Sequence, residues 1–435
     1  DKVVDVTVEQ SSSIVVSPTS LEIPTDGTDF KSFDVKLAAK PSDPVTIDIK
    51  PPTGFTTDKT SLVFNALDFN INQTVKVTTT APAGTTGVIK LLSPDVGQFN
   101  VEVKAIPAAV GQFFVDPVNG DNNNPGTAAR PFQTVKKAVE SDEVRAEAAS
   151  RGSGTDGGTD VTVTVIGPGT ENATGNIQPN ALTRGSVTVI GPAGFNLNLN
   201  GNQLTLNRGY RLQGFTITSG NPTTSPAINL AGAGTPLKNM TIDCTGFTAT
   251  DKTCVEVTAA NTTLTLEGLT LSIAGDQNNT KGIFHNGNNT TLTIIGSTIR
   301  STSSGTGGNG QNVVGIRGNN DNTKLLVTRT TVDFSTITSG TSTDPTVAIL
   351  LTAGGSEVRG SLIKIDGDDG TNKDDAIGVK TDHSSGTVTI TGTTFTTRTN
   401  DRGIGIKRNN SNGIIKQEGN SFPTTPPRLY RDTEI

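Results

Sequence analysis

From about residue 161 onward the chain repeats itself every 25 to 33 residues, and this repeat constrains the fold more than any other feature. One motif places an apolar residue after a small one, usually Ala or Gly, at Ile228, Val255, Ile283, Ile316, Ile349, Ile377 and Ile404. A second motif, apolar-x-apolar-x-Gly-x-Thr-apolar, is centred on Gly214, Asn239, Gly268, Gly296, Arg329, Gly360, Gly392 and Gly419. Two earlier strands, 161–169 and 186–194, begin the series.

Repeats of this length, with short strands and no helices, exclude a helical solenoid, which needs two helices in each repeat. A β-propeller is the runner-up, but its blades need ~40 residues and four strands each. The repeat therefore predicts a right-handed parallel β-helix of about nine coils over residues 161–422, roughly 45 Å long at the spacing of neighbouring strands. The tail, 423–435, breaks the pattern, and we expect it to fold over the last coil or to be disordered.

The composition suits such a stack, because the chain has 49 Gly, no Trp and only 17% charged residues. Inward positions should form ladders of aliphatic side chains, among them Leu264, Leu266, Leu292, Ile294, Val388 and Ile390. Gly at the centre of the second motif fits a bend where a Cβ would crowd the next sheet. Asn pairs at 278–279, 288–289 and 319–320 fit turns with positive φ, and their amides can bond from coil to coil.

Residues 1–107 form a different unit, with eight short alternating strands at 6–8, 14–16, 33–37, 45–49, 61–64, 74–79, 87–92 and 99–105. Strands at this spacing with turn residues between them predict a β-sandwich. The order PTSLEIPTDGT, FDVKLAAKPSDPVTIDI and TSLVFNALDFNINQTVKVTT resembles the Ig-like and Calx-β-like modules of bacterial surface proteins. That resemblance implies no catalytic residues.

We interpret residues 108–160 as a linker and an N-terminal cap for the β-helix. The segment FFVDPVNGDNNNPGTAARPFQTVKKAVE (113–140) resembles the opening of bacterial pectate-lyase-like β-helix proteins. Apolar residues at helical spacing predict one short capping helix over about 133–149. The predicted fold class is thus all-β: a β-sandwich, then a right-handed parallel β-helix with a short N-terminal capping helix.

Charge and hydropathy limit the possible partners. The net charge is −6 and the basic residues are scattered, whereas a nucleic-acid-binding protein needs a basic stripe. No apolar run approaches the ~18 residues of a membrane span. The chain begins at Asp1 within polar, extended sequence, which we interpret as a mature or trimmed N-terminus.

Cys244 and Cys254 are the only cysteines, and they lie ten residues apart. The spacing is not that of a metal or redox pair. It favours a disulfide that closes a short surface loop, which would place the protein in an oxidising compartment. Two free buried thiols are the alternative.

An acidic segment, 364–383, is the one place where chemistry could be concentrated. Spaced carboxylates with Gly turns, at Asp366, Asp368 and Asp369, are typical of loops that bind Ca²⁺, the only cofactor that the sequence suggests. The EF-hand pattern is absent, and an ordinary solvated turn is the alternative.

The segments DDAIGVK (374–380) and RGIGIKR (402–408) resemble the Asp-Asp and Arg-x-Lys elements of polygalacturonases, which pair a general acid with carboxylates that activate water. The resemblance implies a catalytic face made of Asp374, Asp375, Asp401, Arg402 and Lys407. The Gly-His-Gly element of that family is missing, and GIGIK also matches the structural repeat itself. Lyase chemistry would need a basic side chain, and the sequence offers Lys380 and Lys407. His285 is expected to be a turn residue that follows inward Ile283 and Phe284.

We therefore expect an extracellular structural or adhesive protein of the bacterial cell surface or envelope that presents a rigid β-helix. Its partners would be cell-surface components or polysaccharide, with neither nucleic acid nor a transmembrane segment, and it could form a homo-oligomer or lattice. The alternative is a polysaccharide-active enzyme, polygalacturonase- or pectate-lyase-like, with its site near 364–408. The absence of Trp, with only Tyr210 and Tyr430 as tyrosines, counts against that alternative, because sugar clefts commonly use such rings as stacking platforms.

Overall fold

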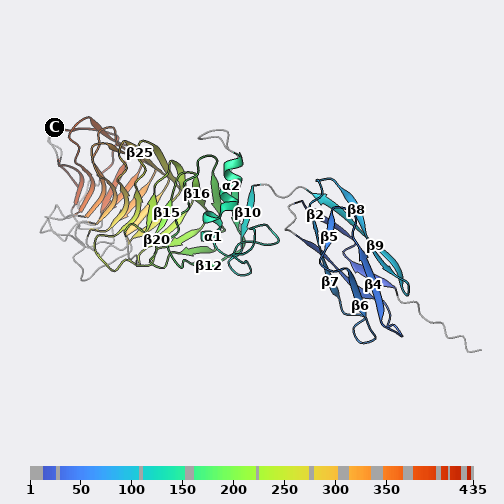
Figure 1. Ribbon diagram of the computed structural model, residues 1–435. Coiled ribbons are helices and arrows are strands. Elements are labelled where there is room, and N and C mark those ends of the chain that lie inside the picture. Colours follow the sequence, from blue (N-terminus) through green and yellow to red (C-terminus); the bar gives the residue numbers. More distant parts are fainter. Residues whose placement is uncertain are drawn as a thin grey trace, which may run out of the picture. The chain divides into compact units, whose positions relative to one another are not determined.

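The computed structural model describes most of the chain. The described residues are 13–25, 30–106, 111–151, 161–221, 225–273, 279–301, 313–334, 346–365, 376–397, 403–409, 412–422 and 429–432. The chain divides into two compact units, residues 1–112 with 127–130, and residues 113–126 with 131–435 (Figure 1).

The N-terminal unit is a β-sandwich of two sheets. One sheet has the order β1-β3-β7-β5 and the other the order β2-β9-β8-β4-β6. Their bounds are β1 Ile14–Ser17, β2 Ser20–Pro24, β3 Lys31–Leu37, β4 Val45–Lys50, β5 Phe55–Thr57, β6 Ser61–Phe64, β7 Gln73–Thr79, β8 Thr86–Ser93 and β9 Gly97–Ile106. Alternate residues point into one core, where Phe33, Ile47, Phe64 and Ile89 are at most 1% exposed. The sequence had not predicted β2 and β5, and its predicted strand at 6–8 lies outside the described residues.

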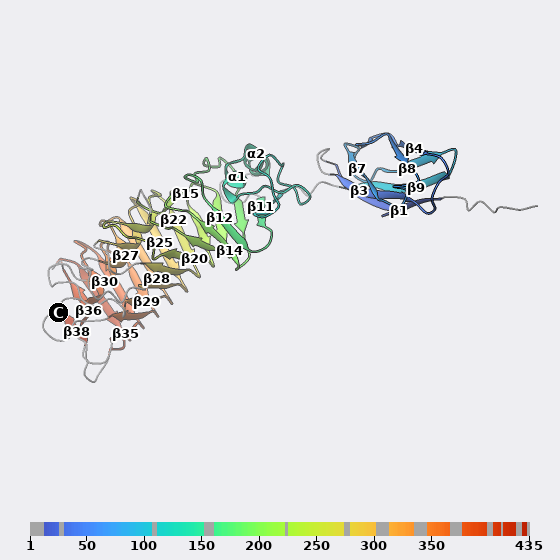
Figure 2. The same ribbon diagram turned by 90° about the horizontal axis from the view of Figure 1, so that it is seen from below.

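The C-terminal unit is a parallel β-helix of three sheets, and the predicted fold class is confirmed (Figure 2). Sheet 1 contains β10 Gln112–Val115, β11 Val161–Val165, β13 Val187–Ile190, β16 Tyr210–Gln213, β19 Gly234–Lys238, β22 Thr263–Glu267, β25 Thr290–Ile295, β28 Thr323–Thr328, β31 Glu357–Arg359, β34 Thr387–Thr391 and β37 Ile414–Glu418. Sheet 2 contains β12 Gly169–Asn172, β14 Phe195–Asn198, β17 Thr216–Thr218, β20 Thr241–Cys244, β23 Thr270–Ile273, β26 Thr298–Ser301, β29 Thr331–Phe334, β32 Leu362–Ile365 and β35 Thr394–Thr397. Sheet 3 contains β15 Leu204–Leu206, β18 Ile228–Leu230, β21 Thr253–Val257, β24 Lys281–His285, β27 Val314–Gly318, β30 Thr346–Leu351, β33 Ala376–Thr381, β36 Gly403–Arg408 and β38 Leu429–Asp432.

The core of the β-helix consists of aliphatic ladders, as the repeat predicts. In sheet 1, Leu266, Ile294, Val327, Val358 and Ile390 lie in register in five successive coils. None of these side chains is exposed to solvent. Such burial of successive aliphatic side chains is the main force that holds the coils together.

The second repeat motif is the bend between sheet 1 and sheet 2. All eight residues at its centre have φ between 48° and 88°, including the two that are not Gly, Asn239 and Arg329. The expectation that a Cβ would crowd the next sheet is wrong at Gly296, where nothing lies within 4 Å of an added Cβ. Gly is favoured there because its backbone adopts the left-handed conformation without strain. Asn279 and Asn289 also have positive φ, and the amide of Asn289 donates to Asn261 of the preceding coil.

Buried hydroxyl groups follow this bend in the later coils. The backbone N–H of Leu269 donates to Ser297 Oγ of the next coil at 3.1 Å, and that of Thr330 donates to Ser361 Oγ at 3.2 Å. These hydroxyls in turn donate to carbonyls of their own bend, Ser297 to Ile295 at 3.0 Å. Buried hydroxyl contacts thus link neighbouring coils at the bend, together with backbone hydrogen bonds such as that from Gly268 N–H to the carbonyl oxygen of Ile295 at 3.0 Å.

The first coil is capped by two short helices rather than the single helix predicted over about 133–149. Helix α1 spans Val135–Glu140 and α2 spans Asp142–Arg151. The helix is interrupted at Ser141. The Oγ of Ser141 accepts a hydrogen bond from the N–H of Val144 and so caps α2. Below α1, the carboxylate of Glu171 occupies an inward position of β12 and accepts the N–H of Val135 at 2.6 Å. Among the described residues, no helix is long and apolar enough to cross a membrane.

Candidate functional site: the outer face of sheet 3

Most of the predicted site residues lie outside the part of the chain that the structure describes. These are Asp366, Asp368, Asp369, Asp374, Asp375, Asp401 and Arg402. Within the described ranges, no group of three or more His, Cys, Asp or Glu residues could hold a metal ion. Lys407 is the one predicted catalytic residue that is described, and it lies on β36.

Lys407 belongs to a column of side chains on the outer face of sheet 3. It is in register with Lys380 of β33, which pairs in turn with Leu350 of β30. The column continues through Arg317 of β27 to Phe284 of β24. The neighbouring residues in each strand, such as Val379 and Ile406, are fully buried in the core, so alternation turns the column outward. We call Arg317, Lys380 and Lys407 the cationic column.

The cations of this column are partly desolvated and repel one another. Burial lowers the pKa of Lys380, and repulsion from Lys407 and Arg317 lowers it further. Asp382 opposes that shift. Burial also lowers the pKa of the Arg317 guanidinium. An acidic residue stands at each end of the column: Glu256 is in register with Phe284, and Asp432 is in register with Lys407. The three cations between these ends would favour a bound anion, although the chain as a whole carries a net charge of −6.

Phe284 forms an aromatic platform at one end of the cationic column. The ammonium of Lys281 lies 5.7 Å from the centre of its ring, and the guanidinium carbon of Arg317 lies 5.5 Å from it. Both are cation–π distances. The expectation that Phe284 points inward with Ile283 is therefore wrong. Because side chains alternate along a strand, counting from the inward Ile283 would have predicted that Phe284 points outward.

A small apolar cluster lies beside the column. Val314, Val347, Ile377 and Ile404 occupy one register position in successive coils, are at most 3% exposed and form a cluster separate from the main core. Leu350 of the column packs against them. Because the four side chains of this cluster are buried, they are not themselves available to a ligand.

The two histidines are interior residues. His285, expected to be a turn residue, ends β24 with 0% exposure, and its Nε2 lies 2.9 Å from the carbonyl oxygen of Thr290. His383 is 1% exposed, with its Nε2 3.2 Å from the carbonyl oxygen of Ile414. A carbonyl only accepts, so each Nε2 carries the proton. Burial lowers the pKa of His285, which keeps that ring neutral.

The two cysteines are joined by a disulfide in the structure. Cys244 ends β20 and Cys254 lies in β21, so the bond closes the connection from sheet 2 to sheet 3. Neither cysteine is exposed, whereas most of the connection that the bond closes, residues 245–252, lies at the surface.

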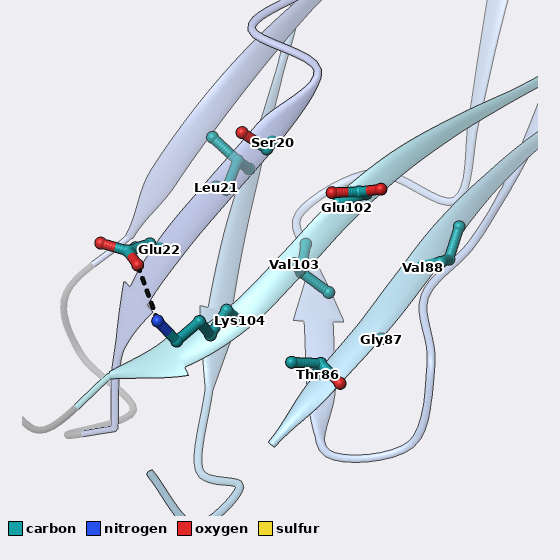
Figure 3. A pocket seen from close by; sticks show the side chains of 9 residues that line it. All are labelled: Ser20, Leu21, Glu22, Thr86, Gly87, Val88, Glu102, Val103 and Lys104. Carbon is teal, nitrogen blue, oxygen red and sulfur yellow. Dashed lines mark hydrogen bonds and ion pairs between the residues drawn. The ribbon is translucent and has the colours of Figure 1, made fainter. Parts of the chain in front are cut away.

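The N-terminal sandwich has a shallow groove across β2, β9 and β8 (Figure 3). Glu22 and Lys104 form an ion pair across it at 3.0 Å, and both side chains are more than half exposed. An ion pair between two solvent-exposed side chains contributes little to stability. This groove holds no column of like charges such as the one on the outer face of sheet 3.

These observations define an all-β protein whose β-helix presents a cationic column and an aromatic platform on one face. No protein-family model and no curated protein matches the chain. Among solved structures it is similar to pectate lyase Pel9A, with a TM-score of 0.33 and 14% identity over 72% of this chain and 80% of that one. It is also similar to the pectin methylesterase from Aspergillus niger in deglycosylated form, with a TM-score of 0.24 and 12% identity over 75% of this chain and 91% of that one. At these values the likenesses carry no functional argument.

Proposed function

We propose that this chain is an extracellular adhesive protein of the bacterial cell surface or envelope, and that its β-helix binds an acidic polysaccharide along the outer face of sheet 3. The observation that carries the proposal is the in-register placement of Arg317, Lys380 and Lys407. Successive coils are ~4.8 Å apart. Lys380 and Lys407 are therefore one coil spacing apart, and Arg317 and Lys380 are two. A linear polymer with one carboxylate on each sugar could place several of its negative charges along such a row.

The neighbouring side chains suit a sugar polymer better than a bare polyanion. The platform of Phe284 offers an apolar ring face, against which the C–H face of a sugar can pack. Leu350 interrupts the cations between Arg317 and Lys380, which gives a second apolar contact. The Cys244–Cys254 disulfide supports an oxidising, extracellular location.

Binding of the purified chain to immobilised polygalacturonate, with neutral dextran as the comparison, tests the proposal. Arg317→Ala with Lys380→Ala should weaken binding about tenfold or more, because each removes a charged contact. The matched control is Lys324→Ala, an exposed lysine on the outer face of sheet 1. Thermal unfolding of each variant shows whether it is still folded. Equal binding by the double variant and the control would refute the proposal.

The enzyme alternative rests on Lys380, whose pKa is lowered by burial and further by the second lysine beside it. A lysine with a lowered pKa is a better general base near neutral pH. Unsaturated products and new reducing ends from acidic polysaccharides, measured with and without Ca²⁺, test this alternative. Unsaturated products that disappear in Lys380→Ala would establish a lyase. Turnover lost in Asp374→Ala and Asp375→Ala would establish a hydrolase and overturn the adhesive role, whereas binding without turnover supports it.

A further inference from the structure

Strand β37 leaves one edge of sheet 1 without a partner at the C-terminal end of the β-helix. Sheet 1 ends at β37, and no further strand or bridge among the described residues pairs with it on that side. The other two sheets are continued at this end, sheet 2 by a bridge from Thr394 to Ser421 and sheet 3 by β38. We call the free side of β37 the β37 edge.

The opposite edge of sheet 1, at β10, is covered by the chain itself. The N–H of Phe114 donates to the carbonyl oxygen of Gly126 at 2.7 Å, and the N–H of Phe132 donates to that of Phe114 at 3.0 Å. An uncovered strand edge presents N–H and C=O groups that another chain can pair with, so proteins usually cover or blunt it. Within the described part of sheet 1, only the β37 edge lacks such a cover.

The backbone groups of the β37 edge follow from the bonds that β37 makes to its inner neighbour. The N–H of Ile414 and the carbonyl oxygen of Glu418 both bond on the side of β34, at 3.1 and 2.9 Å. Backbone groups alternate between the two sides of a strand. The N–H and C=O groups of Ile415 and Gln417 therefore point to the β37 edge.

Gln417 also has a buried side-chain atom without a partner. It is in register with Ile390, which is fully buried, so it occupies an inward position. Its Oε1 is shielded from solvent and accepts no hydrogen bond. A buried acceptor without a donor is costly, whereas a glutamine amide carries donors as well as an acceptor. The amide of a second Gln417 facing this one would supply the missing donor.

The exposed charges of β37 are placed symmetrically about Gln417. Lys416 precedes it and Glu418 follows it, and both side chains are on the outward face. If two β37 strands pair antiparallel about a two-fold axis at Gln417, Lys416 of each copy lies opposite Glu418 of the other. Opposite charges in directly opposed positions stabilise a strand pair. A lysine on an edge strand ordinarily discourages pairing, but in this register its charge is compensated.

We propose that two copies of this chain associate through their β37 edges, antiparallel and related by a two-fold axis at Gln417. The backbone groups of Gln417 then exchange hydrogen bonds between the copies, and sheet 1 continues from one copy into the other. A two-fold interface uses the edge of each copy once, so assembly stops at the dimer. Two sheet 3 faces in one particle would raise avidity toward a polymer that binds them.

Sedimentation velocity of the purified chain over a range of concentrations tests this inference, and we expect a monomer–dimer equilibrium. Glu418→Lys alone, or Lys416→Glu alone, should weaken dimerisation about tenfold or more, because like charges then face each other twice. The variant with both substitutions should dimerise like the wild type, since opposite charges face each other again. Lys324→Glu, which changes an exposed lysine of the interior strand β28, is the matched control and should leave dimerisation unchanged.

Mixing the two single variants distinguishes this register from other contacts. In equal amounts they should form a heterodimer, because every Lys of one copy then faces a Glu of the other. A monomer at every concentration, dimerisation that ignores the charge reversals, or assemblies larger than a dimer would each overturn the inference. Thermal unfolding of each variant shows that lost dimerisation is not lost structure. No polysaccharide is present in these measurements, so their outcome is independent of the proposed function.

Discussion

Glu171 gives the sharpest test of how the first coil is closed. It occupies an inward position of β12, where the next coils place Leu197 and then Ile217. Its carboxylate accepts the N–H of Val135 at 2.6 Å and that of Lys136 at 3.2 Å, so it also caps α1. Burial raises the pKa of Glu171 to about 7, against the opposing effect of these two hydrogen bonds.

This raised pKa ties the stability of the β-helix to pH. Between the ordinary value of 4.5 and about 7, the folded chain holds a proton at Glu171 that the unfolded chain has lost. The stabilisation is therefore fully present below about pH 4.5 and is lost as the pH rises through about 7. At 1.36 kcal/mol for each unit of pKa, the effect amounts to about 3 kcal/mol.

Urea unfolding of the wild type and Glu171→Gln, between pH 4 and 8.5, measures this effect. Gln stays neutral, and its one carbonyl oxygen can still accept an N–H group of α1, so the variant should lack this part of the pH dependence. The wild type should therefore lose about 3 kcal/mol relative to the variant across the range. Glu143→Gln, which replaces an exposed carboxylate of α2, is the control. A difference that is flat, or that grows in favour of the wild type as the pH rises, would show that the reasoning is wrong.

Two further predictions concern the bends and the disulfide. Gly296→Ala should lower the free energy of unfolding by about 1 kcal/mol, because Ala at φ = 57° is strained although its Cβ meets nothing. Arg329→Gly should raise the free energy of unfolding by a few tenths to about 1 kcal/mol, because Gly adopts this conformation without strain. Calorimetry in which both substitutions change the stability in the same direction would contradict this explanation. Reducing the Cys244–Cys254 bond should destabilise the β-helix by about 3 kcal/mol in the chain-entropy picture, measured as a lower Tm with reductant. An unchanged Tm in the reduced protein, verified by thiol titration, would show that the bond contributes nothing.

The β-helix could be predicted from the repeats of the sequence, because one inward position and one bend position recur in almost every coil. The ladder through Leu266 and Ile294 and the bends at Gly268 and Gly296 could thus be predicted residue by residue. In sheet 3 it was harder to predict which residues point inward and which point outward. Several of its strands contain a small buried residue directly before a buried aliphatic one, as at Gly282 and Ile283 in β24, so the alternation restarts within the motif.

The candidate site could be predicted only in part, for the same reason. Lys380 and Lys407 were noted as possible bases, but their side-by-side placement depends on the exact register of two strands. The break at Ser141 did have a signal, since a serine followed by Asp142 and Glu143 is a common start of a helix.

The hydroxyl contacts at the bends have a mechanical consequence. The strands run across the stack, so the hydrogen bonds between coils lie roughly along its axis. A force that pulls the two ends of the β-helix apart therefore stretches these bonds along their length and does not shear them. Each coil is held to the next by its strand ladders and by the aliphatic core, and in the later coils also by bonds at the bend such as that from Leu269 N–H to Ser297 Oγ. Coils pulled in this direction would peel away one after another from an end, each at a similar force. An adhesive stalk built this way would lengthen in steps under tension instead of failing at once.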